Sequence, residues 1–163
     1  MQGKTHQPVI YVYPASAYGE LTPSAFESIH RLNNYLYDPN NVPALAQLPG
    51  VPFFNAQIQF AAQIQQVSFQ NGSGIRYITQ YDQYAAPVNN TDLFYNYIGL
   101  TNDGAYYVVA IFPLTISRLA ETSDPNAILP SGGIPYPAMP AEGRVALLIA
   151  KYAIFGIVPL VIP

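Results

Sequence analysis

Short runs of apolar residues, separated by polar or glycine-rich connections, dominate the first 113 residues. Residues 9–13 are β-branched or aromatic throughout and stop at Pro14, which lacks a ladder donor, so they predict a first strand. Ser24 and Glu27 have the spacing of a capping box, in which two side chains satisfy free N–H groups where a helix begins. Apolar residues at near-helical spacing then predict a helix that ends before Asp38; they are Phe26, Ile29, Leu32 and Leu36.

The next part of the chain predicts a meander of about four antiparallel strands. From Gln57, polar and apolar residues alternate with a period of two, and the phase changes at residues 65–66, which predicts a β-bulge there. Residues 71–74 contain two glycines that can take the positive φ of a hairpin turn, and residues 101–104 are a second turn. The strands are expected at residues 57–69, 75–81, 93–98 and 106–112.

The last two of these strands carry bulky side chains at both odd and even positions, so both faces of the sheet need to be covered. The early helix covers one face, and the C-terminal part of the chain or another chain must cover the second. We therefore expect an α+β fold: an antiparallel sheet of about four to five strands, a helix on one face and a C-terminal segment on the other. The length suits one domain, with a core over residues 8–118 and a proline-rich, then apolar tail over residues 119–163.

A long apolar stretch, residues 145–162, raises the question of a membrane. Lys151 lies inside it, and Gly156 and Pro159 interrupt it, so its unbroken part is shorter than the ~20 residues that a spanning helix needs. We expect a buried or docking helix here, with membrane contact as the alternative. Residues 1–6 have no apolar region of a signal peptide, so for an exported protein we expect the signal to precede this sequence.

Composition adds a surface with few charges. Only 9% of the residues are charged, against about 25% in typical domains, and neutral groups (eleven Asn, eleven Gln and fourteen Tyr) must make the surface polar. Such a surface favours cover by a partner or by further copies of the chain. The net charge of −3 and the lack of a Lys/Arg run argue against nucleic acid, and the lack of cysteine excludes disulfides and zinc–sulfur sites.

The titratable residues do not form a recognisable catalytic or metal-binding motif. His6 and His30 have no Ser, Cys or acid at a diagnostic spacing. Asp103, within Asn-Asp-Gly, suits an ordinary turn better than a calcium site. The sequence therefore predicts no catalytic residue, cofactor or metal, although a hydrolase whose acids meet only in the fold stays open.

Tyrosines beside neutral amides are the main hint of a binding surface. Rigid aromatic rings with amide partners suit glycan stacking or protein recognition, because they bury area at little entropic cost and without desolvating charge. Cross-strand packing of tyrosines is the alternative, and it is favoured over a binding role. The candidate binding residues are Tyr77, Gln80, Tyr81, Tyr84, Asn89, Tyr95, Asn96 and Tyr97.

Several of these segments also resemble a family of bacterial extracytoplasmic and lipoprotein domains, over about residues 8–115. The similar segments are residues 12–14, 52–57, 69–81, 87–90, 92–95 and 99–108, among them FQNGSGIRYITQY and GLTNDGAYYV. The resemblance implies export, and because the family has no established activity it implies no catalytic residue. The family is usually polar and helical after its last strand, whereas this chain is proline-rich and then apolar.

Together these features predict an exported, non-enzymatic interaction domain that binds a protein partner or a second copy of itself. The alternative is a binding module for a glycan or a small apolar ligand that uses the tyrosine and amide residues.

Overall fold

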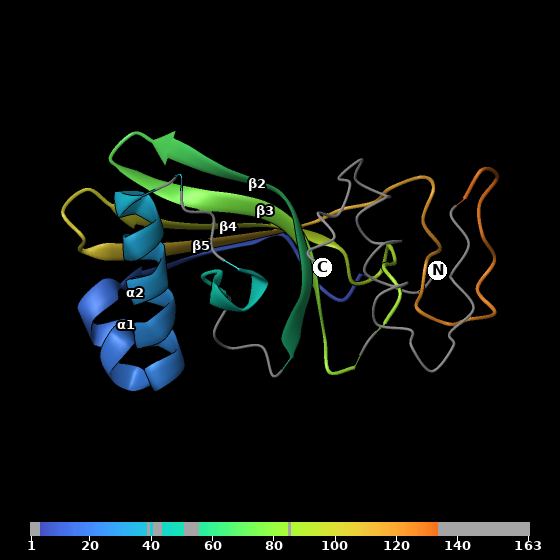
Figure 1. Cartoon of the computed structure of the whole chain (residues 1–163), viewed down its shortest axis with the longest axis horizontal. Helices are drawn as coiled ribbons and strands as arrows, with labels where there is room; N and C mark the ends of the chain where they lie inside the picture. The colour runs from blue at the N-terminus through green and yellow to red at the C-terminus, as the bar shows by residue number, and fades with distance from the viewer. Residues whose placement is uncertain (1–3, 39, 41–43, 51–55, 85, 134–163) are drawn as a thin grey trace, which may run out of the picture.

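An early strand, a helical segment and a run of later strands follow one another along the chain, as the apolar pattern predicts. The computed structural model describes residues 4–38, 40, 44–50, 56–84 and 86–133 (Figure 1). The elements are β1 (Val9–Pro14), α1 (Ala15–Leu21), α2 (Pro23–Tyr37), the 3-10 helix η1 (Leu45–Gln47), β2 (Gln57–Phe69), β3 (Gly72–Asp82), β4 (Phe94–Thr101) and β5 (Tyr106–Pro113).

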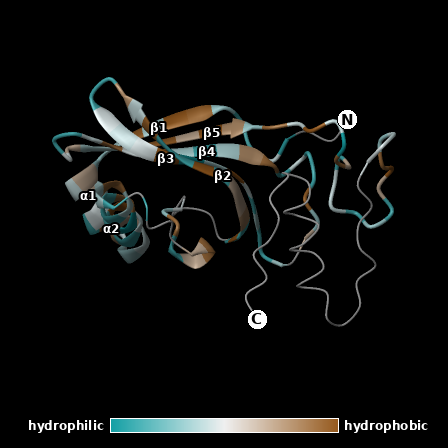
Figure 2. Ribbon diagram, turned by 45° about the horizontal axis from the view of Figure 1, so that its top comes forward, coloured by the Kyte–Doolittle hydropathy of each residue, from teal (hydrophilic) through white to brown (hydrophobic). Residues whose placement is uncertain are grey.

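The strands form one antiparallel sheet in the order β1-β5-β4-β3-β2, which confirms the predicted α+β class. Strands β2 to β5 are the predicted meander. The first strand pairs with the last, so β1 and β2 are the two edges of the sheet among the described residues. Both helices and η1 lie on one side of the sheet (Figure 2).

The helical segment contains two helices rather than the one predicted. Thr22 caps α2, since its hydroxyl accepts a hydrogen bond from the Ala25 N–H at 3.1 Å, and Pro23 occupies the first turn. The prediction that Ser24 is the cap was wrong: proline suits the first helical position because its missing N–H is not needed there, so the helix begins earlier. On the predicted apolar stripe Leu32 is buried, whereas Phe26 is 61% exposed.

The bulge of β2 lies closer to its start than predicted. The pairing with β3 shifts between Ala62 and Gln65, and again near Ile58, and Gln63 takes a φ of 54°. The predicted position at residues 65–66 was therefore wrong by about two residues. As a result, Phe60 and Ala62 pack on the face of the sheet away from the helices, and Ile58 and Ile64 pack on the helix side.

The first hairpin turns at residues 70–71, and its glycines lie in β3 instead of in the turn. Among the described glycines only Gly104 and Gly132 have positive φ. The predicted use of glycine at positive φ was therefore wrong for residues 71–74 and is confirmed for the second hairpin. Gly74 is needed for space: a Cβ there would meet the Ile98 carbonyl and lie 2.6 Å from the Tyr97 hydroxyl.

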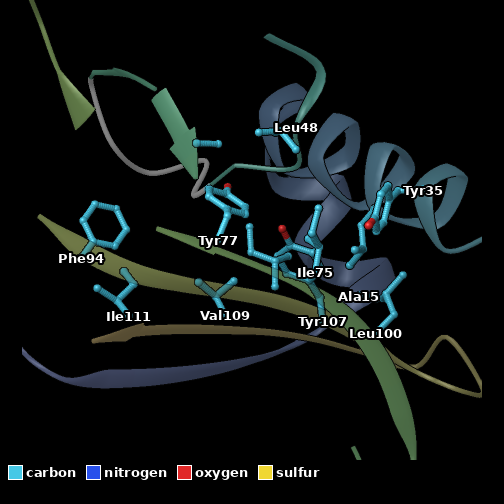
Figure 3. Close-up of a cluster of buried hydrophobic side chains, with 13 residues drawn as sticks. Ala15, Tyr35, Leu48, Ile75, Tyr77, Phe94, Leu100, Tyr107, Val109 and Ile111 are labelled. Carbon is cyan, nitrogen blue, oxygen red and sulfur yellow. The ribbon is translucent and has the colours of Figure 1, made fainter. Parts of the chain in front are cut away.

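The main core lies between the sheet and the helices (Figure 3). Two fully buried tyrosines tie other elements to this core: Tyr77 holds the loop after η1, and Tyr107 holds helix α2. The Tyr77 hydroxyl donates to the Pro49 carbonyl at 2.6 Å, and the Tyr107 hydroxyl and Ser28 hydroxyl are 2.8 Å apart. Tyrosine oxygens thus satisfy backbone and helix groups inside an otherwise apolar core.

A second apolar cluster lies on the opposite face, at the end of the sheet away from the helices. It contains Phe60 and Ala62 of β2, together with Val88, Leu93 and Leu119 from the segments around β4 and β5. Part of the second face is therefore covered by residues 86–93 and 114–120. The predictions for residues 134–163, including the apolar segment, lie outside the described residues, and no described helix is long and apolar enough to span a bilayer.

Candidate functional site

An apolar surface is exposed on β1 and β5, on the face opposite the helices. Ile10 and Val12 are 60% and 58% exposed, and Tyr106 and Phe112 on the neighbouring strand are 48% and 40% exposed. The register places all four side chains on one face, because Ile10 pairs with Ala110 and every second residue of β5 points the same way. We call Ile10, Val12, Tyr106 and Phe112 the exposed apolar face.

These side chains are exposed because the helices cover only the other side of the sheet. Helices α1 and α2 pack on the other side of the sheet, where Tyr107, Val109 and Ile111 alternate with the exposed residues and are fully or almost fully buried. The second cluster covers only the far end of the open face. β1 and β5 are therefore half-covered strands with apolar side chains on both faces, and their brown ribbons in Figure 2 follow that composition.

A polar group lies next to the exposed apolar face, towards the middle of the sheet. Arg76 of β3 donates to the Gln65 side chain at 3.0 Å and to the Tyr95 hydroxyl at 3.3 Å. Its guanidinium also lies 5.9 Å from the centre of the Tyr95 ring. The positive charge is thus held by neutral groups, and no carboxylate is among its described partners.

Tyr97 lies between this polar group and the glycines of the sheet. Its ring reaches across the sheet surface above Gly74 and Gly99, and a Cβ at Gly99 would lie 2.5 Å from the Tyr97 hydroxyl. That hydroxyl is buried and has no hydrogen-bond partner among the described residues. Burial, with a smaller contribution from Tyr95, raises the pKa of Tyr97 to about 12, so the group stays a neutral donor at physiological pH.

Three of the sequence-predicted binding residues lie on the helix side of the sheet. Tyr77 and Asn96 are fully buried, and Tyr81 is partly buried and stacks on Phe94 at 5.7 Å. The Asn96 amide lies near enough to Tyr77 to influence its pKa, yet neither amide atom makes a hydrogen bond among the described residues. Burial raises the pKa of Tyr77 well above its usual range. These residues are part of the core.

Three others lie around the loop after β3. Gln80 and Asn89 are fully buried, and the Gln80 side-chain oxygen accepts the Asn89 backbone N–H at 3.1 Å. Asn89 donates to the Asp92 carboxylate at 2.9 Å and accepts the Thr91 N–H at 3.0 Å, so both side chains hold the loop in place. Tyr84 is 67% exposed in the same region.

Tyr95, Tyr97 and Gln80 point to the face away from the helices, and of these Gln80 is covered by the loop after β3. The structure thus divides the set among the core, the loop and the open face, and does not bring it to one surface. The prediction treated neighbours along the strands as neighbours in space, whereas successive residues of a strand point to opposite faces.

The residues of the exposed apolar face were missed as site residues. A signal for them existed in the sequence: residues 9–13 are apolar on both parities and lie between Pro8 and Pro14. Prolines on both sides are typical of an edge strand, and apolar side chains on both faces of that strand leave one face uncovered when helices pack on the other face alone.

The matched pair Tyr97→Phe and Tyr107→Phe tests the two tyrosine environments. Removing the unpartnered hydroxyl of Tyr97 is expected to leave the free energy of unfolding unchanged or to raise it by up to about 1 kcal/mol. Removing the Tyr107 hydroxyl, which is 2.8 Å from Ser28 in the core, is expected to lower it by about 1–2 kcal/mol. Urea denaturation of both variants measures the difference; equal effects would contradict the assigned environments.

The described residues offer little for metal or acid–base chemistry. They contain no group of three His, Asp or Glu side chains that could hold a metal ion. The Asp103 carboxylate accepts hydrogen bonds from the Thr101 hydroxyl at 2.5 Å and the Ala105 N–H at 3.0 Å, and these bonds lower its pKa. Asp103 thus serves the second hairpin turn, as the Asn-Asp-Gly sequence predicts.

Comparison with known proteins leaves the exposed apolar face as the main guide to function. The chain matches no protein-family model, no curated protein and no solved structure. The resemblance to extracytoplasmic and lipoprotein domains stays a prediction, and the function is inferred from the geometry of the described residues.

Proposed function

We propose that the chain is an exported, non-enzymatic domain that binds protein through the exposed apolar face. The observation that supports the proposal is the adjacency of four large, exposed apolar side chains on β1 and β5 in a chain with only 9% charged residues. Complete burial of one such side chain is worth about 1.5–3 kcal/mol, so covering the face supplies a substantial part of a binding free energy. Contiguous apolar surface of this kind is typical of protein contacts.

Site-specific photo-crosslinking in cells tests the proposal. A photoreactive phenylalanine derivative replaces Tyr106, which is 48% exposed on the face, or Tyr37, which is 93% exposed at the end of α2. Because only the first position lies in the proposed contact, we expect a discrete crosslinked product from position 106 and none from position 37.

The mass of that product identifies the kind of partner, since a second copy adds 17.8 kDa. No discrete product from position 106, or the same products from both positions, would contradict the proposal. A Val12→Glu substitution in the position-106 variant is the control, and it is expected to abolish the product because a buried, unpaired carboxylate is strongly unfavourable.

The export part of the proposal is supported by the resemblance given above, and the absence of cysteine is compatible with it. Its test is the accessibility of a tagged chain to added protease in intact cells, next to a cytoplasmic marker. Protection of the chain equal to that of the marker would contradict export and leave the binding proposal untouched.

A second candidate, a site for a small polar ligand such as a glycan, is favoured by the Tyr97 hydroxyl, which has no hydrogen-bond partner among the described residues, and by Arg76, which pairs with Tyr97 across β3 and β4. A ligand at a hundred times its dissociation constant stabilises a protein by about 2.7 kcal/mol, which a thermal-unfolding panel of glycans detects. A shift that disappears in Tyr97→Phe would support this function; no shift across the panel would oppose it.

A further inference from the structure

We propose that the partner is a second copy of this chain, and that two copies pair antiparallel along the outer edge of β1, which pairs with no other described strand and is called the free edge below. The pairing joins two five-stranded sheets into one continuous sheet. It rests on the proposed function in taking β1, which carries two of the four residues of the exposed apolar face, as the contact. It adds the partner, the strand register and the groups that form the bonds.

The direction of the backbone groups of β1 follows from one hydrogen bond. The Ala15 N–H donates to the Ala105 carbonyl at 2.8 Å, and this pair continues the β1–β5 register by one step. In an antiparallel ladder hydrogen-bonded pairs alternate with non-bonded pairs. Tyr11 and Tyr13 therefore direct their N–H and C=O groups to β5, whereas Ile10 and Val12 direct theirs to the free edge.

The prolines beside β1 fit this assignment. Pro14 occupies an outward-facing position in the strand, and Pro8 lies at the next outward-facing position before it. A proline without an N–H is tolerated in an edge strand where its nitrogen faces away from the sheet. The free edge thus offers the donors and acceptors of Ile10 and Val12, bounded on each side by a residue that cannot donate.

One self-complementary register satisfies all the outward N–H and C=O groups of Ile10 and Val12. When Tyr11 lies on the two-fold axis, Ile10 of one copy pairs with Val12 of the other, so the N–H and C=O of both residues are satisfied in both copies. Pro8 then faces Pro14, at positions where no N–H is lost. A shift of two residues in either direction leaves the carbonyl of Ile10 or of Val12 facing a proline.

The side chains and charges agree with an identical partner. β1 and the neighbouring β5 contain no charged residue, so two copies approach along this edge without like-charge repulsion. On the open face the pairing sets Ile10 against Val12 of the other copy, which extends the exposed apolar face into one continuous surface. An isologous contact of this kind is closed and forms a dimer instead of a fibre.

The other edge of the sheet is less suited to pairing. β2 has register shifts near Ile58 and between Ala62 and Gln65, with Gln63 at a φ of 54°. Bulges twist an edge and interrupt its row of hydrogen-bonding groups, which is how natural sheets avoid edge-to-edge contact. β1, by contrast, pairs with β5 without a register shift over its full length.

The contact is small, because it consists of one short strand edge and the side chains beside it. Interfaces at the low end of the size range are weak or transient, and we expect a dissociation constant on the order of tens of micromolar. The dimer is therefore expected to dissociate within a concentration series that sedimentation equilibrium covers.

Val12→Pro and Val12→Ala separate edge pairing from packing of the apolar face. Val12→Pro removes the outward N–H from both copies but no bond to β5, so the monomer is expected to fold. Val12→Ala keeps the N–H and loses more of the apolar side chain than Val12→Pro does. We expect Val12→Pro to raise the dissociation constant in sedimentation equilibrium about tenfold or more, and clearly more than Val12→Ala.

Ile10→Pro, which removes the other outward donor, is a second variant with the same expected result, and circular dichroism confirms that each variant is folded. A dimer that Val12→Ala weakens as much as Val12→Pro would overturn the edge pairing while leaving the proposed use of the apolar face. A chain that stays monomeric up to millimolar concentration would overturn the second copy as the partner. A crosslinked product of another mass from position 106 would then still support the proposed function.

Discussion

Gly74→Ala is expected to lower the free energy of unfolding by about 3 kcal/mol, at the upper end of what overpacking a filled interior costs. The physical reason is the backbone of β4, which runs directly against Gly74. A Cβ there would meet the Ile98 carbonyl oxygen and lie 2.7 Å from the Gly99 Cα. These are backbone atoms of a paired strand, so they cannot rotate away as a flexible side chain can. Urea or thermal unfolding of the purified variant measures the effect.

Gly104→Ala is the matched control for this prediction. Gly104 has a φ of 68° in the second hairpin turn, but nothing lies within 4 Å of a Cβ placed there. Its substitution is expected to lower the free energy of unfolding by about 1 kcal/mol, because the left-handed region is unfavourable for an L-residue. A Gly74→Ala variant as stable as Gly104→Ala would show that β4 and β3 are not packed as closely as the structure has them.

Asn90→Ala is expected to lower the free energy of unfolding by a comparable amount, about 3 kcal/mol, because it removes a set of hydrogen bonds. The Asn90 side chain is 2% exposed and holds the segment after β5 through several hydrogen bonds. Its oxygen accepts the Ile116 N–H at 2.8 Å, and its nitrogen donates to the Ile116 and Leu119 carbonyls at 3.2 Å each. Removing the amide leaves the Ile116 N–H and the Leu119 carbonyl without this partner, whereas the Ile116 carbonyl still accepts the Leu119 N–H. Such unsatisfied groups cost more than the bonds themselves contribute.

The effect of Asn90→Ala is also expected to be local. The second apolar cluster depends on Leu119, so residues 114–120 should lose protection from amide hydrogen exchange before β5 does. Asn33→Ala, at an exposed position of α2, is the control and is expected to change stability by less than about 0.5 kcal/mol. Unchanged stability or unchanged exchange in Asn90→Ala would contradict the assigned network.

The strands were predictable because their side chains repeat with a clear period. The two hairpins and the first strand follow from alternation and from turn residues such as those before Gly104, whose positive φ is confirmed. Helix α1 was not predictable in this way, since its sequence ASAYGEL is too short to show a helical period. The partner of the first strand could not be predicted either, because apolar periodicity says nothing about strand order.

The candidate binding residues show a different limit. Aromatic and amide residues cluster in the sequence around Tyr77 and Tyr95, but the faces of their strands separate them in space. Composition alone indicated an uncovered surface, and only the positions of α1 and α2 show that this surface lies on β1 and β5.

Amide hydrogen exchange at β1, measured by NMR at increasing protein concentration, tests the central claim most directly. The claim predicts that the amides of Ile10 and Val12 exchange quickly in the dilute monomer and slow down as the dimer forms, whereas those of Tyr11 and Tyr13 are protected throughout by β5. Exchange at Ile10 and Val12 that does not change with concentration, in samples where dimer is present, would contradict the pairing of two copies along this edge.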